Sequence, residues 1–286
     1  MSRRLSDLLY GHRRTQVSLL LAGPLGWLVI AYLGSLAVLF AASFWHLDTF
    51  SGQVVRGFGL DNFQTLVTQD VYRSIVLRTV LIAAAVTVTD AILAFPIAFF
   101  MAKLASTRTR ALLVIAVVMP LWSSYLVKVY SWRIILAEDG ILNWALDPFG
   151  LSGPGFGNVA TWLVFSYLWL PYMILPVYAA LERIPDSLLD ASGDLGGGAG
   201  MTFRRVVLPL ALPGVVAGSI FTFSLTLGDY ITPQIVSSTQ FIGNVVYTNV
   251  GVANNLPLAA AFATVPVIIM ILYLLGARRL GAFESL

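Results

Sequence analysis

The sequence predicts an all-α integral membrane protein, a single domain over residues 1–286 with six transmembrane helices. The chain is 58% hydrophobic and only 11% charged, with a mean hydropathy of +0.84. Its apolar runs are long enough to cross a hydrocarbon core of about 30 Å, which takes about 20 residues per helix. Its lysines and arginines gather in alternate loops. A water-soluble domain of this size carries far more polar surface, so lipid must surround most of the chain.

We expect six spans, in chain order residues 17–44, 76–102, 111–134, 159–182, 208–232 and 257–277. The first follows the basic segment MSRRLSDLLYGHRR, which is similar to the start of a signal peptide. Its apolar run is too long for a cleaved signal and lacks a clear cleavage site, so we interpret it as a retained anchor. Small residues four apart indicate close contacts between helices. They occur at Ala22 and Gly26 in the first span and at Gly214 and Gly218 in the fifth.

Basic residues predict the orientation, because cytoplasmic loops carry an excess of lysine and arginine. Twelve of them lie on one side of a six-span count: Arg3, Arg4, Arg13, Arg14, Lys103, Arg108, Arg110, Arg183, Arg204, Arg205, Arg278 and Arg279. The opposite loops hold mainly acids: Asp48, Asp61, Asp70, Glu138, Asp139 and Asp147. We therefore expect both termini, and the loop of residues 184–207, to lie in the cytoplasm.

The residues that catalytic and metal sites need are scarce. The chain has no cysteine, and its two histidines, His12 and His46, lie at opposite ends of the first span. A G-x-S-x-G motif, a P-loop and a cluster of histidines or carboxylates are all absent from the sequence. We expect no enzymatic activity, no metal, no cofactor bound by this chain and no nucleic-acid partner. A secondary transporter is an alternative, but the two related halves common in such folds are not evident.

The loop between the fourth and fifth spans contains DASGDLGGGAGMTFRRVVLP, residues 190–209. Pro185 opens a predicted helix of about ten residues, with Asp186 or Ser187 as its cap. An apolar stripe of Leu188, Leu189, Ser192 and Leu195 follows, and Gly196, Gly197, Gly198 and Gly200 then end the helix. Exposed leucines on such a helix favour a protein partner, and a helix resting on its own bundle is the equal alternative.

This loop resembles the cytoplasmic signature of ABC-importer permeases: an acid, two small residues, a glycine four positions later, then an aliphatic residue and Leu-Pro. The matching residues are Asp190, Ala191, Ser192, Gly196, Val206, Leu208 and Pro209, with Phe203 resuming the apolar pattern. Asp190 replaces the commoner glutamate, and Ser192 replaces the second alanine. The resemblance implies a coupling helix that docks in a groove of a cytoplasmic ATPase subunit.

Residues 119–143, MPLWSSYLVKVYSWRIILAEDGILN, resemble permeases of spermidine/putrescine-type importers. The matching residues are Pro120, Trp122, Lys128, Tyr130, Trp132, Gly140, Leu142 and Asn143, with Asn62-Phe63, Arg78-Thr79, LGDYITPQIV at 227–236 and IGNVVY at 242–247. The resemblance implies a second, homologous permease, an ATPase dimer that binds ATP and magnesium, and an external solute-binding protein. It implies polyamines as the first candidate solute, with thiamine, iron, sulfate or an amino-acid-like solute as alternatives.

A path for an ammonium group is expected on the third span. Trp122, Tyr125, Lys128 and Trp132 fall within an arc of about 120° on one helix, and aromatic faces attract cations. Tyr130 and Tyr230 come from the two matching motifs. The alternative is that these rings pack or anchor the outer interface.

Two acids within the spans are further candidates for that path, because charge at membrane depth usually faces an interior. Asp229 lies near the outer end of the fifth span, and Asp90 lies near the middle of the second. An ion pair between Asp229 and Lys128 is the alternative for the first acid. Hydrogen bonds within the bundle, beside Thr87 and Thr89, are the alternative for Asp90.

Overall fold

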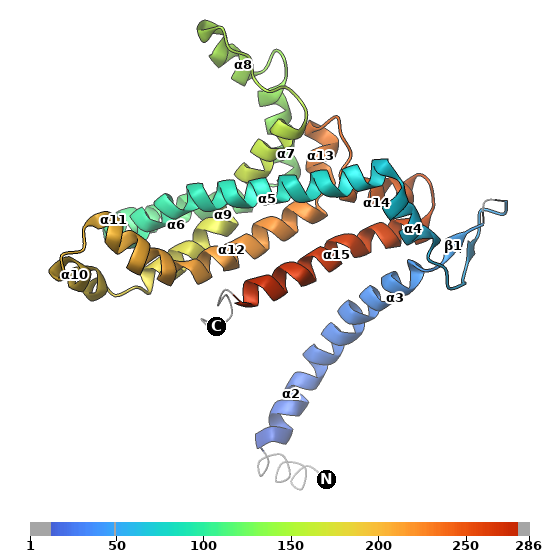
Figure 1. The fold of residues 1–286 in the computed structure, drawn as a ribbon, viewed down its shortest axis with the longest axis horizontal. Helices are drawn as coiled ribbons and strands as arrows, with labels where there is room; N and C mark the ends of the chain where they lie inside the picture. Colours follow the sequence, from blue (N-terminus) through green and yellow to red (C-terminus); the bar gives the residue numbers. More distant parts are fainter. Residues whose placement is uncertain (1–12, 49, 280–286) are drawn as a thin grey trace.

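The computed structural model describes residues 13–48 and 50–279, which are almost wholly helical (Figure 1). Arg3, Arg4 and His12 lie outside the described residues. The elements are α2 (Arg13–Leu28), η1 (Val29–Leu33), α3 (Gly34–Ala42), β1 (His46–Leu47), β2 (Val54–Val55), α4 (Asp61–Thr68), α5 (Asp70–Phe99), η2 (Phe100–Leu104), α6 (Thr107–Trp122), α7 (Tyr125–Leu136), α8 (Ile141–Leu146), η3 (Asp147–Phe149), α9 (Asn158–Glu182), α10 (Asp186–Asp194), α11 (Ala199–Thr202), η4 (Phe203–Val207), α12 (Leu208–Gly228), α13 (Ile231–Val236), α14 (Ile242–Gly251) and α15 (Leu256–Arg279).

Five of the expected spans correspond to continuous helices that are long and apolar enough to cross a membrane. These helices are Leu20–Ala42, Asp70–Leu104, Asn158–Glu182, Ala199–Gly228 and Leu256–Arg278. The second begins earlier than the sequence pattern indicates, because α5 includes the polar turn at Asp70. The fifth also begins earlier, because α11 and η4 lead without a break into α12.

The prediction of one straight helix over residues 111–134 is wrong. The span is broken into α6 and α7, which meet at an angle of 92°. Ser123 and Ser124 adopt extended backbone angles, with ψ of 149° and 132°. Near the end of α6, the carbonyl of Pro120 accepts hydrogen bonds from Ser123 Oγ at 2.8 Å and from Lys128 Nζ at 3.0 Å. Side chains thus satisfy a helix-terminal carbonyl that would otherwise lack a partner, and they stabilise the bend.

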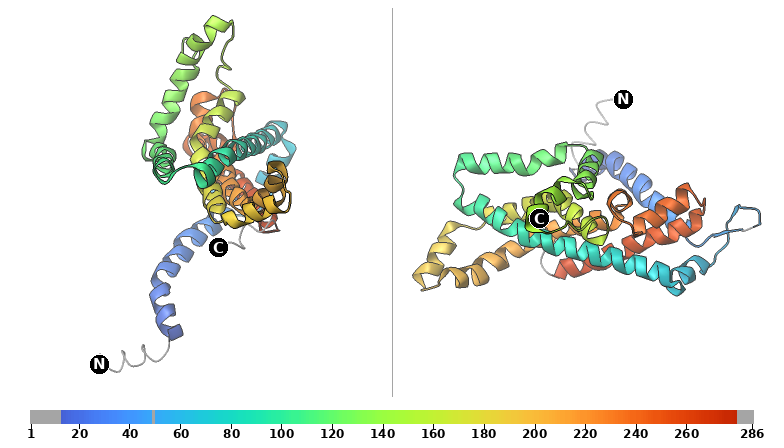
Figure 2. Two further views of the ribbon diagram at one scale, coloured as in Figure 1. Left: turned by 90° about the vertical axis from the view of Figure 1, so that its left-hand side faces the viewer. Right: turned by 90° about the horizontal axis from the view of Figure 1, so that it is seen from above.

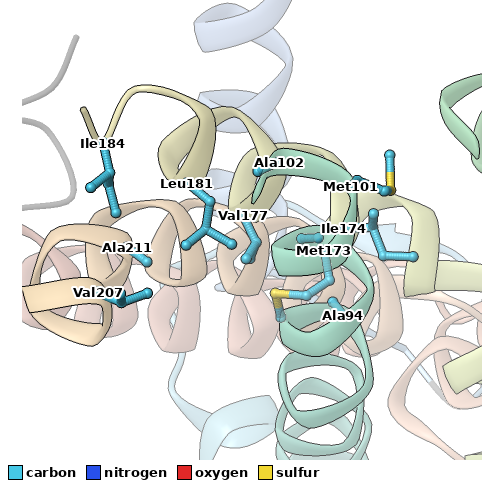
Figure 3. Close-up of a cluster of buried hydrophobic side chains, with 11 residues drawn as sticks. Ala94, Met101, Ala102, Met173, Ile174, Val177, Leu181, Ile184, Val207 and Ala211 are labelled. Atoms are coloured by element: carbon cyan, nitrogen blue, oxygen red, sulfur yellow. The ribbon is translucent and has the colours of Figure 1, made fainter. Parts of the chain in front are cut away.

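The centre of the bundle is the packing of α5, α9 and α12. Figure 3 shows one buried cluster, whose members include Met101, Met173, Val177, Val207 and Ala211. The close helix contact expected at Gly214 and Gly218 is confirmed. A Cβ at Gly214 would lie 2.5 Å from the Ala180 Cβ atom, and one at Gly218 would lie 2.6 Å from Met173 Sδ.

The helix of residues 13–42 diverges from the rest of the bundle (Figure 1). No residue of η1 or α3 is buried, and only α3 packs beside α15. No atom lies within 4 Å of the position of a Cβ at Gly26. The contact expected at Ala22 and Gly26 is therefore not made among the described residues, where this part of the helix has no neighbour.

Two ends of the bundle can be told apart in Figure 1. The α10 end carries α10, α11 and the turn between η2 and α6. The α13 end carries α13, α14, α4 and the β1–β2 hairpin, whose strands pair antiparallel with His46 opposite Val55. An arm formed by α7 and α8 projects sideways from the bundle (Figure 2).

Candidate functional site

The loop at the α10 end folds as a short helix followed by a glycine turn. Gly196 has φ of +77°, a left-handed conformation that favours glycine, and its N–H donates to the carbonyl of Gly193. Gly197 passes so close to Ser192 that a Cβ there would lie 2.6 Å from the Ser192 carbonyl oxygen. The sequence pattern therefore located the end of this helix correctly, and two of its glycines are required by geometry.

The start of α10 differs from the expected cap. Pro185 occupies the N-cap position, and no side chain caps the helix. Asp186 instead accepts a hydrogen bond from Lys103 Nζ at 2.8 Å. This hydrogen bond and the positive charge of Lys103 lower the pKa of Asp186, so its carboxylate is charged at neutral pH.

Apolar side chains of this loop are open to the surroundings. Leu195 is 89% exposed, and Leu188, Met201 and Phe203 are also exposed. Asp190 and Ala191 are exposed on α10, and Leu208 and Pro209 are exposed at the start of α12, while Val206 is half-buried. Ser192 points inward, where its hydroxyl lies 2.8 Å from that of Thr202 on α11. Most of the matching residues are therefore exposed. Ser192 instead helps to hold the loop together through its contact with Thr202.

At the α13 end, the broken third span meets the end of α12. Tyr125, the first residue of α7, donates a hydrogen bond from its hydroxyl to Asp229 Oδ2. Asp229 Oδ1 accepts from the N–H groups of Ile231 and Thr232, at 2.7 and 3.1 Å. The Thr232 hydroxyl lies 2.6 Å from that of Tyr125. Asp229 thus satisfies the first amides of α13, and the break in the third span brings Tyr125 to it.

The ion pair considered between Asp229 and Lys128 is absent. Lys128 Nζ donates to the carbonyl of Pro120. Within the described part of the chain, no lysine or arginine lies within ion-pair distance of Asp229. The carboxyl group of Asp229 is therefore held by hydrogen bonds and has no ion-pair partner among the described residues.

The break in the third span separates Trp122 from the predicted stripe, whereas Tyr125, Lys128 and Trp132 all lie on α7. Trp122 is 88% exposed and belongs to α6, while Trp132 packs on Tyr167 with 5.4 Å between ring centroids. Tyr130 on α7 is exposed. Tyr230 stacks on Tyr247 of α14, with 4.8 Å between centroids. The predicted stripe is therefore wrong for Trp122 alone, because the residue-to-residue rotation of a helix does not continue through Ser123 and Ser124.

A row of rings that the sequence reading missed leads away from Asp229. Tyr125 stacks on Trp169 with centroids 6.1 Å apart, Trp169 lies 6.0 Å from Tyr172, and Tyr172 lies 6.5 Å from Phe221. We call Tyr125, Trp169, Tyr172 and Phe221 the aromatic row. Trp169 and Tyr172 are three residues apart on α9, a spacing that places both on one helix face and could have indicated them.

Asp90 lies in the interior of the bundle, with 0% exposure. Neither carboxylate oxygen makes a hydrogen bond within the described structure. Thr87 donates to the carbonyl of Ala83, and Thr89 accepts from Trp162 Nε1, so neither bonds Asp90. The expected local bonding is therefore wrong, and Asp90 does not face an open surface in this conformation.

Other residues of the matching motifs have structural contacts. Asn62 donates to the carbonyls of Ser43 and Trp45 and so holds the exit of the first helix. The Thr79 hydroxyl accepts from the N–H of Ile242, and Arg78 donates to the carbonyl of Gln240. Asn143 folds the arm by donating to Ala137 and Glu138 and accepting from Gly153. Among the described residues, no three histidine or acidic side chains gather as metal ligands do.

Comparison with known proteins covers most of the chain. Residues 76–282 match the family described as "Binding-protein-dependent transport system inner membrane component". The chain is 49% identical to the "Inner membrane ABC transporter permease protein YdcU" of Escherichia coli K12, over 94% of this chain and 90% of that protein. It is 30% identical to the "Spermidine/putrescine transport system permease protein PotB" of Escherichia coli K12, over 87% of this chain and 92% of that protein.

Solved structures share the fold. A chain of a bacterial alginate ABC transporter, crystallised in complex with an alginate pentasaccharide-bound periplasmic protein, superposes with a TM-score of 0.74 and 15% identity. The match covers 98% of this chain and 97% of that one. A chain of the inward-facing MetNI methionine ABC transporter matches with a TM-score of 0.52 and 19% identity, over 71% of this chain and 93% of that one.

Proposed function

This chain belongs to the family of binding-protein-dependent transport system inner membrane components, and from that membership we propose that it imports a cationic polyamine. It is the permease subunit of an ABC importer and a multi-pass inner-membrane protein. Permease subunits of this family are not ATPases and bind no cofactor, because a partner subunit uses the ATP.

The observation that carries the polyamine proposal is the setting of Asp229. Its carboxylate is fixed by Tyr125, Ile231 and Thr232, but no basic side chain of the described residues neutralises it. Polyamines carry several ammonium groups, and a fixed negative charge of low exposure attracts them strongly. Relatives named as spermidine/putrescine permeases, at about 30% identity, support the same solute.

The aromatic row provides further contacts beside Asp229 and thereby a path along which the ammonium groups of the solute can pass. Its rings follow α9 from Asp229 toward Phe221 on α12, which is exposed. Each ring face attracts an ammonium group by roughly 0.5–2 kcal/mol. In a polyamine, methylene groups separate the ammonium groups. One ammonium group can therefore meet Asp229 while the others lie against the rings of the aromatic row. Tyr125 and Asp229 are thus the proposed contacts, while the proposal omits the buried Asp90.

For energy coupling we assign the loop of residues 184–207 to contact with the ATPase. Its exposed apolar side chains, Leu188, Leu195 and Met201, need a partner surface, and Leu195 makes almost no contact with its own bundle. The loop lies on the side that carries the basic residues, which the orientation rule places in the cytoplasm. A second permease completes the pore, and an external binding protein delivers the solute.

The proposed function is tested with the assembled importer in proteoliposomes that contain ATP. Uptake of radiolabelled putrescine and spermidine is measured for the wild type and for Asp229→Asn. Asparagine caps helices as well as aspartate does, so the variant removes the charge and keeps the start of α13. We expect uptake to fall about tenfold, the factor that ~1.4 kcal/mol of lost attraction represents.

Asp139→Asn is the matched control, because Asp139 is an exposed acid of the loop that follows α7. Its uptake should equal that of the wild type. Uptake of thiamine, iron, sulfate or an amino acid in place of polyamines would overturn the solute assignment. Uptake by this chain without ATP would overturn its place in an ABC importer.

A further inference from the structure

We propose that Lys103 and Arg110 form a clasp that fastens the start of α10 to the ends of α5 and α9, so that the coupling loop and these spans move as one body. The inference rests on the proposed function, because a loop that receives force from an ATPase must pass it to the pore. It assigns two positioning residues that act through α10 and touch neither solute nor nucleotide.

Lys103 makes the first half of the clasp. It lies in η2, the turn that ends the long helix of α5, and its side chain is only 9% exposed. Its Nζ atom donates both to the backbone carbonyl of Ile184 and to Asp186 Oδ1. Ile184 and Asp186 flank Pro185, where α9 gives way to α10. One buried cation therefore holds both sides of the joint between a span and the loop.

Arg110 makes the second half. Its Nε and Nη2 atoms donate to the carbonyls of Met101 and Ala102 in η2, each at 3.0 Å. Its Nη1 atom lies 3.4 Å from Glu182 Oε1, at the last residue of α9. The hydroxyl of Tyr178, one turn earlier on α9, donates to the same oxygen at 2.7 Å. Arg110 thus joins α6 to the end of α5 and to the end of α9.

The two cations bond to the same group of helix ends, those of α5 and α9. Carbonyls at the end of a helix lack partners in their own helix, and basic side chains satisfy them here. Hydrogen bonds from charged donors are stronger than those between neutral groups. The apolar cluster of Met101, Ala102, Leu181 and Ile184 fills the space between these helix ends (Figure 3). A push on α10 therefore moves α5 and α9 before it bends the joint at Pro185.

The absence of cysteine in the sequence allows a direct test with two spin labels. Ser187→Cys on α10 and Leu112→Cys on α6 place them at exposed positions on either side of the clasp. Pulsed electron paramagnetic resonance is measured on the importer assembled with its ATPase subunit. It should give one narrow distribution of distances between the two labels, and ATP should not change that distribution. Lys103→Met should broaden it about twofold, because a methionine makes no charge-assisted hydrogen bond.

Three controls separate the clasp from general loss of structure. Lys103→Arg keeps the charge and should keep the narrow distribution. Arg108→Met removes an exposed arginine of the same turn, which makes no ion pair among the described residues, and should change nothing. Asp186→Asn should broaden the distribution less than Lys103→Met, because the bond to Ile184 remains. If the Lys103→Met protein does not assemble with the ATPase subunit, Asp186→Asn is used for the test in its place.

A distribution that changes with ATP in the wild type, or one that stays narrow in both Lys103→Met and Asp186→Asn, would overturn the clasp. Its consequence for transport is measured separately, as putrescine imported per ATP hydrolysed. We expect Lys103→Met to lower that ratio about threefold while hydrolysis continues. Absence of putrescine uptake in the wild type would reject the proposed solute, and the label distances would still decide the clasp.

Discussion

The two ends of the bundle use charged side chains in different ways. At the α10 end, Lys103 and Arg110 each meet an acid, and the pairs join separate helices. At the α13 end, Asp229 is held by a tyrosine, a threonine and two backbone amides, without a basic partner in the described structure. Paired charges fasten elements to one another, whereas a fixed and uncompensated charge remains available to a cation that is not part of the chain.

Asp90 provides a third case between the two ends. It is as buried as any residue of the core, but neither of its oxygens has a partner in the described structure. A buried polar group without a hydrogen-bond partner is costly. The comparison therefore predicts three responses to mutation: loss of solute binding at Asp229, loss of coupling at Lys103, and a gain in stability at Asp90.

The largest effect is expected from reversing the charge at the α13 end. Asp229→Lys would place a cation beside the aromatic row and repel an ammonium group instead of attracting it. Putrescine uptake should fall at least about a hundredfold, since each ~1.4 kcal/mol is a factor of ten. The measurement is initial uptake in proteoliposomes with ATP. Asp139→Lys, with the same change on an exposed acid, is the control, and equal uptake by the two variants would contradict the distinction between the ends.

The aromatic row predicts a smaller effect on the same solute. Trp169→Leu removes the ring between Tyr125 and Tyr172. Spermidine binding to the purified importer should weaken about two- to thirtyfold, the range that ~0.5–2 kcal/mol per ring implies. Trp144→Leu, which removes an exposed ring on α8, is the matched control. If both variants bind spermidine as the wild type does, the aromatic row takes no part in solute recognition.

At Asp90 the comparison predicts a gain in stability. Asp90→Leu removes a buried polar group that has no partner and keeps a side chain of similar size, so the free energy of unfolding should rise by ~1–3 kcal/mol. Thermal unfolding of the protein in detergent measures the change. Asp70→Asn alters an exposed ion pair with Arg73 and should have almost no effect. A less stable Asp90→Leu protein would indicate that the carboxyl group has a partner outside this chain.

The smallest effect concerns pH at the α10 end. Lys103 lowers the pKa of Asp186 below its ordinary value of 3.8, so its carboxylate stays charged from pH 5 to pH 8. A depressed pKa contributes stability above 3.8 that is lost only as the pH falls through the lower, folded-state value. The distance between labels at Ser187→Cys and Leu112→Cys should therefore be constant from pH 5 to pH 8. A distribution that broadens between pH 7 and pH 5 would contradict this assignment.

The apolar runs predicted most of the architecture, because lipid imposes length and composition on each span. Five of the six runs are continuous helices, and the glycines at 214 and 218 make the predicted contact. The third run is also long and apolar enough to cross a membrane, but it is bent by 92°. Hydropathy does not report such a bend. Its cause is local, in Pro120 and the two serines that follow.

The site was predicted less completely, because its contacts join distant parts of the chain. The sequence indicated Tyr125 and Asp229 separately, but their hydrogen bond depends on the bend after Trp122. The similar depth of Asp229 and Lys128 in the membrane was consistent with an ion pair. In the structure, Lys128 instead donates to the carbonyl of Pro120, which the bend leaves without a helical partner. The link from Lys103 to Asp186 spans 83 residues and has no local pattern that would indicate it.

The central claim is that Asp229 at the α13 end binds the solute, whereas Lys103 and Arg110 at the α10 end hold helices together. One measurement tests this claim directly. Equilibrium binding of radiolabelled spermidine is measured on the purified importer without its binding protein, for the wild type, Asp229→Asn and Lys103→Met. We predict that Asp229→Asn weakens binding about tenfold and that Lys103→Met binds as the wild type does. Equal binding by Asp229→Asn and the wild type, or an equal loss in both variants, would contradict the claim.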